Sequence, residues 1–211
     1  MSASQHLHYS KLNVSFLTLI ASRLAPLRCL QVANNPHLTD QEMAQVLPHC
    51  EKLEQVDLQN CAQIGDGTLH SLTRKVSLRA LRWIGNLATT SDGYAHLAQN
   101  SHNLRSVNLS GSLYFFSDTA LRLLTCATAL DSLDLSFCPL EDDAFSCIHP
   151  SLAFLNLQGC SAITDRTLYQ LAKFPSLQHI FLAFNDKITV EGLRALSHLK
   201  TLKVYACANV A

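Results

Sequence analysis

Residues 152–160 read LAFLNLQGC, and the same frame of residue types recurs along the chain. Leu152 opens this frame, the aliphatic residues Leu155 and Leu157 follow three and five positions later, and Cys160 closes it. Eight copies of the frame occur in the 211 residues, and their first leucines are Leu27, Leu53, Leu78, Leu104, Leu130, Leu152, Leu177 and Leu199. The copies therefore recur every 22 to 26 residues, a period typical of stacked repeats.

A repeat of this size cannot bury its own apolar face, so each copy must stack on the next to build one continuous core. The two inner aliphatic positions alternate with mostly polar residues, which predicts a short strand with one buried face. The period and the frame together indicate leucine-rich repeats. We expect an α/β fold, a leucine-rich-repeat solenoid (horseshoe) with a parallel concave β-sheet and convex helices.

Helix starts follow the frame in most copies. A Ser/Thr-Asp pair opens an amphipathic stretch at Thr39-Asp40, Ser91-Asp92, Ser117-Asp118 and Thr164-Asp165. Such side chains accept hydrogen bonds from the free N–H groups at a helix start, and Thr39 to Glu42 has the spacing of a capping box. In the fifth copy, Pro139 and the early pair Asp142-Asp143 shorten this segment, so we expect a tighter or 3₁₀ turn there.

The frame also sets the domain boundaries. Residues 27–211 should form the leucine-rich-repeat domain of eight copies, the last truncated at Ala211. This ending suggests a fragment, a short isoform or an incomplete gene model, and a natural end that frays or dimerises is the alternative. Residues 1–26 should form an N-terminal flanking helix or partial repeat, with Phe16, Leu17, Ile20 and Leu24 as its buried stripe. The stretch from Val14 to Ala21 also fits a short signal-peptide core, the less favoured interpretation.

Composition argues against two classes of partner. Lys and Arg number 16, Asp and Glu number 16, and the formal net charge is zero. The basic residues are scattered and form no stripe that could follow a phosphate backbone, so we expect no nucleic-acid ligand. No apolar run approaches the roughly 20 residues of a membrane span, and we expect no membrane association.

The eight cysteines would suggest disulfides in a secreted chain, but their positions favour another interpretation. Cys61, Cys138, Cys160 and Cys207 all close a frame, where other copies carry Asn or Ser. A small side chain at this turn should lie inward beside backbone groups. Adjacent strands would bring Cys138 and Cys160 within bridging reach, yet Cys61 and Cys207 have no such partner. We therefore expect reduced thiols and an intracellular protein, cytoplasmic or nuclear.

No motif for catalysis, a metal or a cofactor is present. The chain lacks a CxxC pair, an HExxH run, a phosphate-binding glycine loop and a GxSxG elbow. Cys147 and His149 are too isolated for a thiol–imidazole pair or a metal site. We expect neither an enzyme nor a cofactor.

The frame from Leu152 to Cys160, continued by Ile163-Thr164-Asp165 and Leu168, resembles a known family. It is similar to the cysteine-containing leucine-rich repeats of F-box/LRR proteins, and the resemblance covers roughly residues 12 to 211. The resemblance implies substrate recognition in an SCF-type ubiquitin ligase. The family's F-box, which docks the Skp-type adaptor and through it the cullin, usually precedes the repeats. Residues 1–26 are too short to contain it, so both partners are expected only in a product that carries an F-box.

Partner binding should fall on the concave face, at frame positions that alternate with the core. The expected binding residues are Phe154, His179, Phe181, Tyr205, Asp134, Lys203, Asn156, Arg82 and Asp57. Phe154, Phe181 and Tyr205 should be the anchor, because aromatic side chains dominate interface energetics. Phe137 and Phe184, at the eighth frame position, fit either the surface or the core. A free-standing repeat adaptor, inhibitor or effector without a ubiquitin role is the alternative function.

Overall fold

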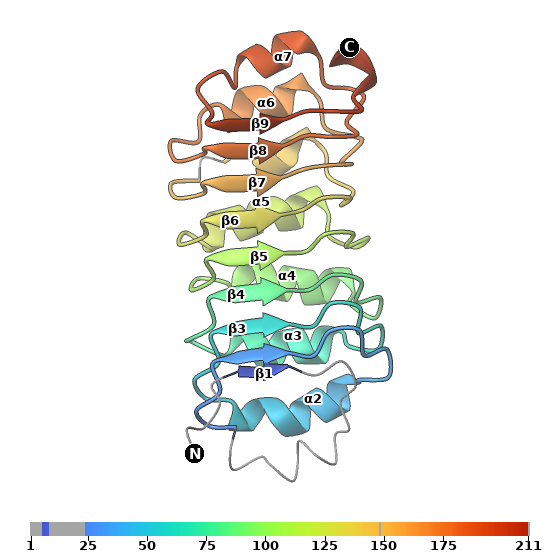
Figure 1. The fold of residues 1–211 in the computed structure, drawn as a ribbon, viewed down its shortest axis with the longest axis vertical. Helices are drawn as coiled ribbons and strands as arrows, with labels where there is room; N and C mark the ends of the chain where they lie inside the picture. Colours follow the sequence, from blue (N-terminus) through green and yellow to red (C-terminus); the bar gives the residue numbers. More distant parts are fainter. Residues whose placement is uncertain (1–5, 9–23, 148, 211) are drawn as a thin grey trace.

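The structure is a computed structural model that describes residues 6–8, 24–147 and 149–210. Nine parallel strands form one sheet in sequence order (Figure 1). They are β1 (His6–His8), β2 (Cys29–Gln31), β3 (Gln55–Asp57), β4 (Ala80–Arg82), β5 (Ser106–Asn108), β6 (Ser132–Asp134), β7 (Phe154–Asn156), β8 (His179–Phe181) and β9 (Thr201–Lys203). Each repeat from coil one (β2) to coil eight (β9) thus contributes one strand, and β1 adds one more.

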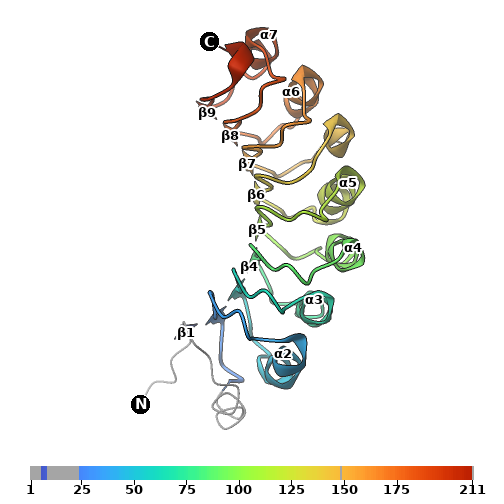
Figure 2. The ribbon, with the colours of Figure 1, turned by 90° about the vertical axis from the view of Figure 1, so that its right-hand side faces the viewer.

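Helices follow most strands and cover the opposite side of the molecule. The α-helices are α2 (Asp40–Val46), α3 (Asp66–Thr73), α4 (Ser91–Gln99), α5 (Ser117–Cys126), α6 (Asp165–Leu171) and α7 (Val190–Arg194). The 3₁₀ helices are η2 (Leu47–His49), η3 (Asp142–Phe145) and η4 (Ala208–Val210). Figure 2 shows the sheet on the concave side of a gently curved stack and the helices on its convex side. The expected solenoid is confirmed.

The core lies between the sheet and the helices, where the frame places its aliphatic residues. The fourth frame position of every coil is in register across the sheet, so that Val56, Leu81 and Val107 are successive neighbours. Almost all residues at this position are buried. Leu202 of coil eight is 36% exposed, because no described coil covers β9. The stacking therefore weakens at that end.

The helix starts confirm two expected caps and correct two others. Thr39 and Glu42 form the capping box of α2, and Thr164 caps α6. Ser91 and Ser117 do not cap their helices, because α4 and α5 begin one residue earlier than expected. The caps are Thr90, whose side chain accepts from the Asp92 N–H, and Phe116, which offers no side-chain acceptor. These two coils have one extra residue before the helix, so that Ser91-Asp92 and Ser117-Asp118 are the first two residues of α4 and α5.

The first helical residue also joins one coil to the next, which the sequence analysis did not anticipate. Asp66 accepts hydrogen bonds from Thr90 N (2.9 Å) and Thr90 Oγ1 (2.6 Å) of the following coil. Asp165 does the same with Thr189, at 2.8 and 2.6 Å. Asp40 and Asp142 occupy the same position and make similar bonds. These carboxylates stabilise the stack on its convex side.

Coil five has the expected 3₁₀ turn, η3, in place of an α-helix. Behind it, His149 is fully buried and is held by the backbone on both sides. Its Nε2 lies 3.0 Å from the Ala127 carbonyl oxygen, and its Nδ1 lies 3.0 Å from Leu152 N. The neutral ring with a proton on Nε2 satisfies both contacts. His149 is thus a buried residue that links the backbone of coils four and six.

The closing residue of the frame turns inward, as expected. The thiols of Cys61, Cys138, Cys160 and Cys207 donate to carbonyl oxygens of the preceding coil at 3.1–3.3 Å. All eight cysteines are free thiols. Burial raises the pKa of Cys138 and of Cys160 to about 12, so neither is a reactive thiolate near neutral pH.

Some expectations concern residues outside the described ranges. The flanking helix with Phe16, Leu17 and Ile20 falls there, and so does the signal-peptide alternative at Val14 to Ala21. In the described part of the chain, none of the helices combines the length with the apolar composition that a membrane span requires.

Candidate protein-binding surface

The eighth frame position lies in the loop that follows each strand. The backbone there is left-handed in all eight coils. The φ angles lie between 52° and 70° at Asn34, Asn60, Gly85, Gly111, Phe137, Gly159, Phe184 and Ala206. Most of these residues donate their N–H to a carbonyl of the next coil, as Phe137 does to Gln158 at 2.8 Å. The stack of coils therefore imposes this conformation on whatever residue occupies the position.

The open question about Phe137 and Phe184 is answered by this geometry. Both side chains turn away from the core, and they are 51% and 48% exposed. A bulky residue with a positive φ is rare because its Cβ crowds the backbone. Strained residues of this kind cluster at binding sites.

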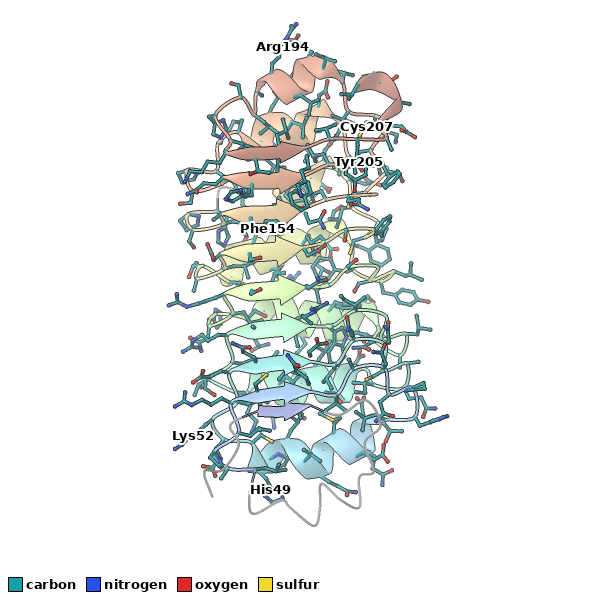
Figure 3. The ribbon with its side chains drawn as sticks, viewed as in Figure 1. His49, Lys52, Phe154, Arg194, Tyr205 and Cys207 are labelled. Atoms are coloured by element: carbon teal, nitrogen blue, oxygen red, sulfur yellow. The ribbon has the colours of Figure 1, made fainter. Side chains whose placement is uncertain are left out.

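Two pairs of aromatic side chains lie on strands β7 and β8 and in the segments that follow β8 and β9. Phe154 and Phe181 meet edge to face, with ring centroids 5.2 Å apart, and Phe184 and Tyr205 do so at 5.6 Å. The Lys203 Nζ lies 4.4 Å from the centroid of Phe181, within the range of a cation–π contact. We call these five residues the aromatic cluster. In Figure 3, Phe154 lies over the strands and Tyr205 lies toward their carboxyl ends.

Two contacts order the margin of the aromatic cluster. The Tyr205 hydroxyl donates to Gln158 Oε1 at 3.3 Å, across the strands from β9 toward β7. His179 is half-buried and pairs in register with Phe154 on one side and Thr201 on the other. Of the expected binding residues, the structure brings together Phe154, Phe181, Lys203 and His179. Tyr205 contacts Phe184 and Gln158 instead.

Asp134 and Asn156 lie beside the aromatic cluster but are occupied with each other. Asp134 Oδ2 accepts from Asn156 Nδ2 at 3.1 Å and from Asn108 Nδ2 at 3.4 Å. Its Oδ1 accepts from the Ser136 N–H at 2.9 Å and from the Ser136 hydroxyl at 2.6 Å. This polar ladder holds β5, β6 and β7 together and gives the cluster a rigid border.

Arg82 and Asp57 lie on β4 and β3, near the other end of the sheet from the aromatic cluster. Arg82 Nε is 3.7 Å from Asp57 Oδ2, and the Asp57 side chain is only 13% exposed. The Arg82 side chain is 52% exposed, whereas the ion pair and the Gln59 N–H, 3.2 Å from Asp57 Oδ1, cover the Asp57 carboxylate. The structure therefore does not join these residues to the cluster.

Cys147 and His149 form no catalytic pair, because both ring nitrogens of His149 contact the backbone. Burial lowers the pKa of His149, although the contact with Ala127 opposes this shift. Among residues 6–8, 24–147 and 149–210, no three potential ligands gather around a common point for a metal ion.

The sequence analysis missed a second exposed apolar region, at the loops that leave β4 to β6. We call it the exit edge; it consists of Leu87, Leu113, Tyr114, Phe116 and Phe137, each at least 43% exposed. Beside it lies a hollow of about 190 Å³, lined by Gly85, Leu87, Tyr94, Gly111, Leu113 and Tyr114. Hydrophobic periodicity could not find this region, because the run from Leu113 to Phe116 also contains the fully buried Phe115.

Comparisons with known proteins agree with this architecture. A family model described as "Leucine Rich repeat" matches residues 175–197. A chain from the crystal structure of the Rad7 and Elc1 complex in yeast is similar in fold, with a TM-score of 0.61 and 16% identity over 90% of this chain. So is the leucine-rich-repeat-containing protein LegL7 from Legionella pneumophila, with a TM-score of 0.62 and 18% identity over 91% of this chain. This chain spans 64% of the first solved chain and 69% of the second.

The chain therefore has the leucine-rich-repeat fold, and the family model recognises one of its repeats at residues 175–197.

Proposed function

We propose that this chain binds a protein partner through the aromatic cluster, which lies on strands β7 to β9 of the concave sheet and in the segments that follow β8 and β9. The observation that carries the proposal is the pair of edge-to-face aromatic contacts, with Lys203 above Phe181. Such rings offer large contact areas at a modest cost in conformational entropy. The polar ladder beside the cluster supports the proposal, since a surface held rigid loses little entropy on binding.

The partner's chemistry follows from the charges near the rings. Lys203 is the only Lys, Arg, Asp or Glu residue within strands β7, β8 and β9. Its ammonium group is exposed and contacts one ring. We therefore propose a protein segment that places a carboxylate beside an apolar or aromatic side chain.

The biological setting we propose is substrate recognition for an SCF-type ubiquitin ligase inside the cell. The cysteine-containing frame carries this proposal through its resemblance to F-box/LRR repeats. The likeness of fold adds little to it, because the yeast and Legionella structures match almost equally well. A free-standing adaptor, inhibitor or effector remains the second candidate, and an F-box joined to the repeats separates the two.

Photocrosslinking tests the binding surface. A photoreactive phenylalanine analogue replaces Tyr205 in one variant and Tyr169 in another, because Tyr169 is similarly exposed but lies on α6. We expect a discrete protein adduct from position 205 and none from position 169. Equal crosslinking from both positions would rule out a preferred concave site.

The crosslinked partner then serves for affinity measurements. Phe181→Ala and Tyr205→Ala should each weaken binding at least tenfold, as for residues at the centre of an interface. Leu87→Ala, outside the aromatic cluster, should leave affinity unchanged. Unchanged affinity in both aromatic variants would refute the site.

The ubiquitin setting is tested separately on the endogenous product. Co-purification of a Skp-type adaptor and a cullin would support the receptor function. Their absence, with the crosslinked partner still present, would favour the free-standing scaffold and leave the binding surface intact.

A further inference from the structure

The eighth frame position has a different occupant in neighbouring coils of the exit edge. Coils three and four carry Gly85 and Gly111 there, and coil five carries Phe137. All three residues share the same left-handed conformation. The eighth frame position therefore has no side chain in two consecutive coils and carries a large ring in the next.

The missing side chain at Gly111 opens the hollow beside the exit edge, whereas the space at Gly85 is taken by Asn60, whose Oδ1 would lie 2.5 Å from an added Cβ atom. A Cβ atom added to Gly111 would meet nothing within 4 Å, so the space above this residue is open. The buried ring of Tyr94 lines the hollow, fixed by its hydroxyl, which donates to Ser112 Oγ at 2.9 Å. The edge-to-face contact of Tyr94 with Phe115, at 5.6 Å, holds it from the other side. The hollow is thus preformed.

The filled position produces a projecting ring. One edge of Phe137 lies against Gly159, where a Cβ atom would come within 2.4 Å of the ring, and about half of the side chain faces solvent. Glycine costs much less than phenylalanine at a positive φ, and three other coils have it there. The stability of coil five therefore does not require phenylalanine at this position.

Charge is absent from the loops of this edge. Residues 34–39, 60–65, 85–90, 111–116 and 137–140 contain no Asp, Glu, Lys or Arg. Two such edges can meet without like-charge repulsion and without burying an ion, which would cost free energy. The formal net charge of the whole chain is zero, which also favours self-association.

We propose that two copies of this chain associate through their exit edges, with Phe137 of each copy seated in the other copy's hollow. Projection and hollow lie on the same edge, one to two coils apart, so a two-fold axis between them forms both contacts at once. Each hollow of about 190 Å³ is complete only when the second copy supplies the ring. Leu87, Leu113 and Tyr114 surround the seated ring.

The size of the edge predicts a weak dimer. Partly exposed aromatic and leucine side chains bury roughly 100 Å² each, so the exit edges of two copies bury on the order of 1,000 Å². That area is near the lower limit of specific interfaces. We therefore expect a dissociation constant of about 1–100 μM. The proposal does not depend on the function of the aromatic cluster.

Sedimentation equilibrium of the full chain tests the proposal, with variants chosen from residues that the same position already accepts. Phe137→Gly removes the ring and introduces the residue of coils three, four and six. Gly111→Asn fills the hollow with the residue of coils one and two. Asn34→Gly and Ala206→Asn introduce the same two residues at coils one and eight, outside the exit edge and the aromatic cluster, and serve as controls.

We expect the wild type and both controls to dimerise, and Phe137→Gly and Gly111→Asn each to raise the dissociation constant at least tenfold. A mixture of these two variants should associate more tightly than either alone, because the ring of one still fits the hollow of the other. Fluorescence of the buried Trp83 verifies that each variant is folded. A wild type that stays monomeric, a dimer indifferent to Phe137→Gly, or a mixture no tighter than its components would overturn the proposal.

Discussion

Replacing Asp142 with alanine removes the carboxylate that joins coil five to coil six. Asp142 Oδ1 accepts from Thr164 N at 2.8 Å and from Thr167 Oγ1 at 2.6 Å, and Oδ2 accepts from Thr164 Oγ1 at 2.7 Å. Thr167 N adds a longer contact at 3.2 Å. Coil five has only the short η3 turn in place of an α-helix, so this carboxylate ties coil six to coil five on the convex side, opposite the pairing of β6 with β7.

The magnitude follows from the number of bonds lost. A hydrogen bond to a charged group contributes about 1.5–3 kcal/mol. Asp142 is half-buried. In the variant, water can therefore accept the hydrogen bonds that the hydroxyls of Thr164 and Thr167 donated to the carboxylate. Counting chiefly the two backbone donors, we expect Asp142→Ala to lower the free energy of unfolding by about 2–4 kcal/mol. That is a large share of the roughly 5–15 kcal/mol typical of a folded domain.

Urea unfolding provides the measurement, with two probes. Trp83 is the single tryptophan of the chain and is fully buried, so its fluorescence follows coil three, and far-UV circular dichroism follows the whole stack. Asp143→Ala is the matched control, because Asp143 is the next residue and is exposed. It should change stability by less than about 0.5 kcal/mol.

The same variant should show a distinct pH dependence. Burial alone would raise the pKa of Asp142, but the hydrogen bonds from Thr167 and Thr164 outweigh it and hold the pKa below its ordinary value. The folded state therefore favours the ionised form. Its stabilising effect is present above the usual carboxyl pKa of about 3.9 and is lost as pH falls through the lowered value. If Asp142→Ala and Asp143→Ala have the same urea midpoint, the Asp142 carboxylate does not stabilise the contact between coils five and six.

Three further predictions concern other parts of the stack. Because burial lowers the pKa of His149, the unfolded chain takes up the proton first, and acidification below about pH 6.5 should destabilise the wild type. His149→Gln should make the urea midpoint depend less on pH between about pH 7 and 5, and an unchanged dependence would contradict this. Timed iodoacetamide labelling with mass spectrometry should modify partly exposed Cys126 well before Cys138 and Cys160, whose pKa values burial raises to about 12; equal rates would contradict their burial. Hydrogen exchange should be fast beyond Leu199 and slow from Leu109 to Leu157, because the last coil has a neighbour on one side only; uniform protection to Val210 would argue otherwise.

Much of the fold could be predicted from the sequence, because stacking buries the same frame positions in almost every coil. The spacing of Leu152, Leu155 and Leu157 predicted a strand and its buried face, and Pro139 predicted the 3₁₀ turn of coil five. The wrong caps at Ser91 and Ser117 had a local cause. A Ser-Asp pair fits the first two positions of a helix as well as it fits the cap and the position after it. Only the path of the preceding loop decides between these two placements.

The surfaces were harder to predict, for a different reason. Apolar periodicity predicts which residues face the core of a regular strand or helix. The exposure of Phe137 depends instead on its positive φ angle. The exit edge was missed because Phe115 is core and its neighbours Tyr114 and Phe116 are not, although all three look alike in the sequence. The aromatic cluster was easier to find, since Phe154 and Phe181 stand at positions that alternate regularly with buried residues.

The left-handed residue that ends each strand has a consequence for how such a protein can change over time. Its conformation is imposed by hydrogen bonds between coils, so asparagine, glycine, alanine and phenylalanine all occupy it in this one chain. A single codon change at that site adds or removes a large ring at the surface while the core stays untouched. Natural variation, or a designed library limited to these eight residues, could therefore alter what the protein recognises without refolding it.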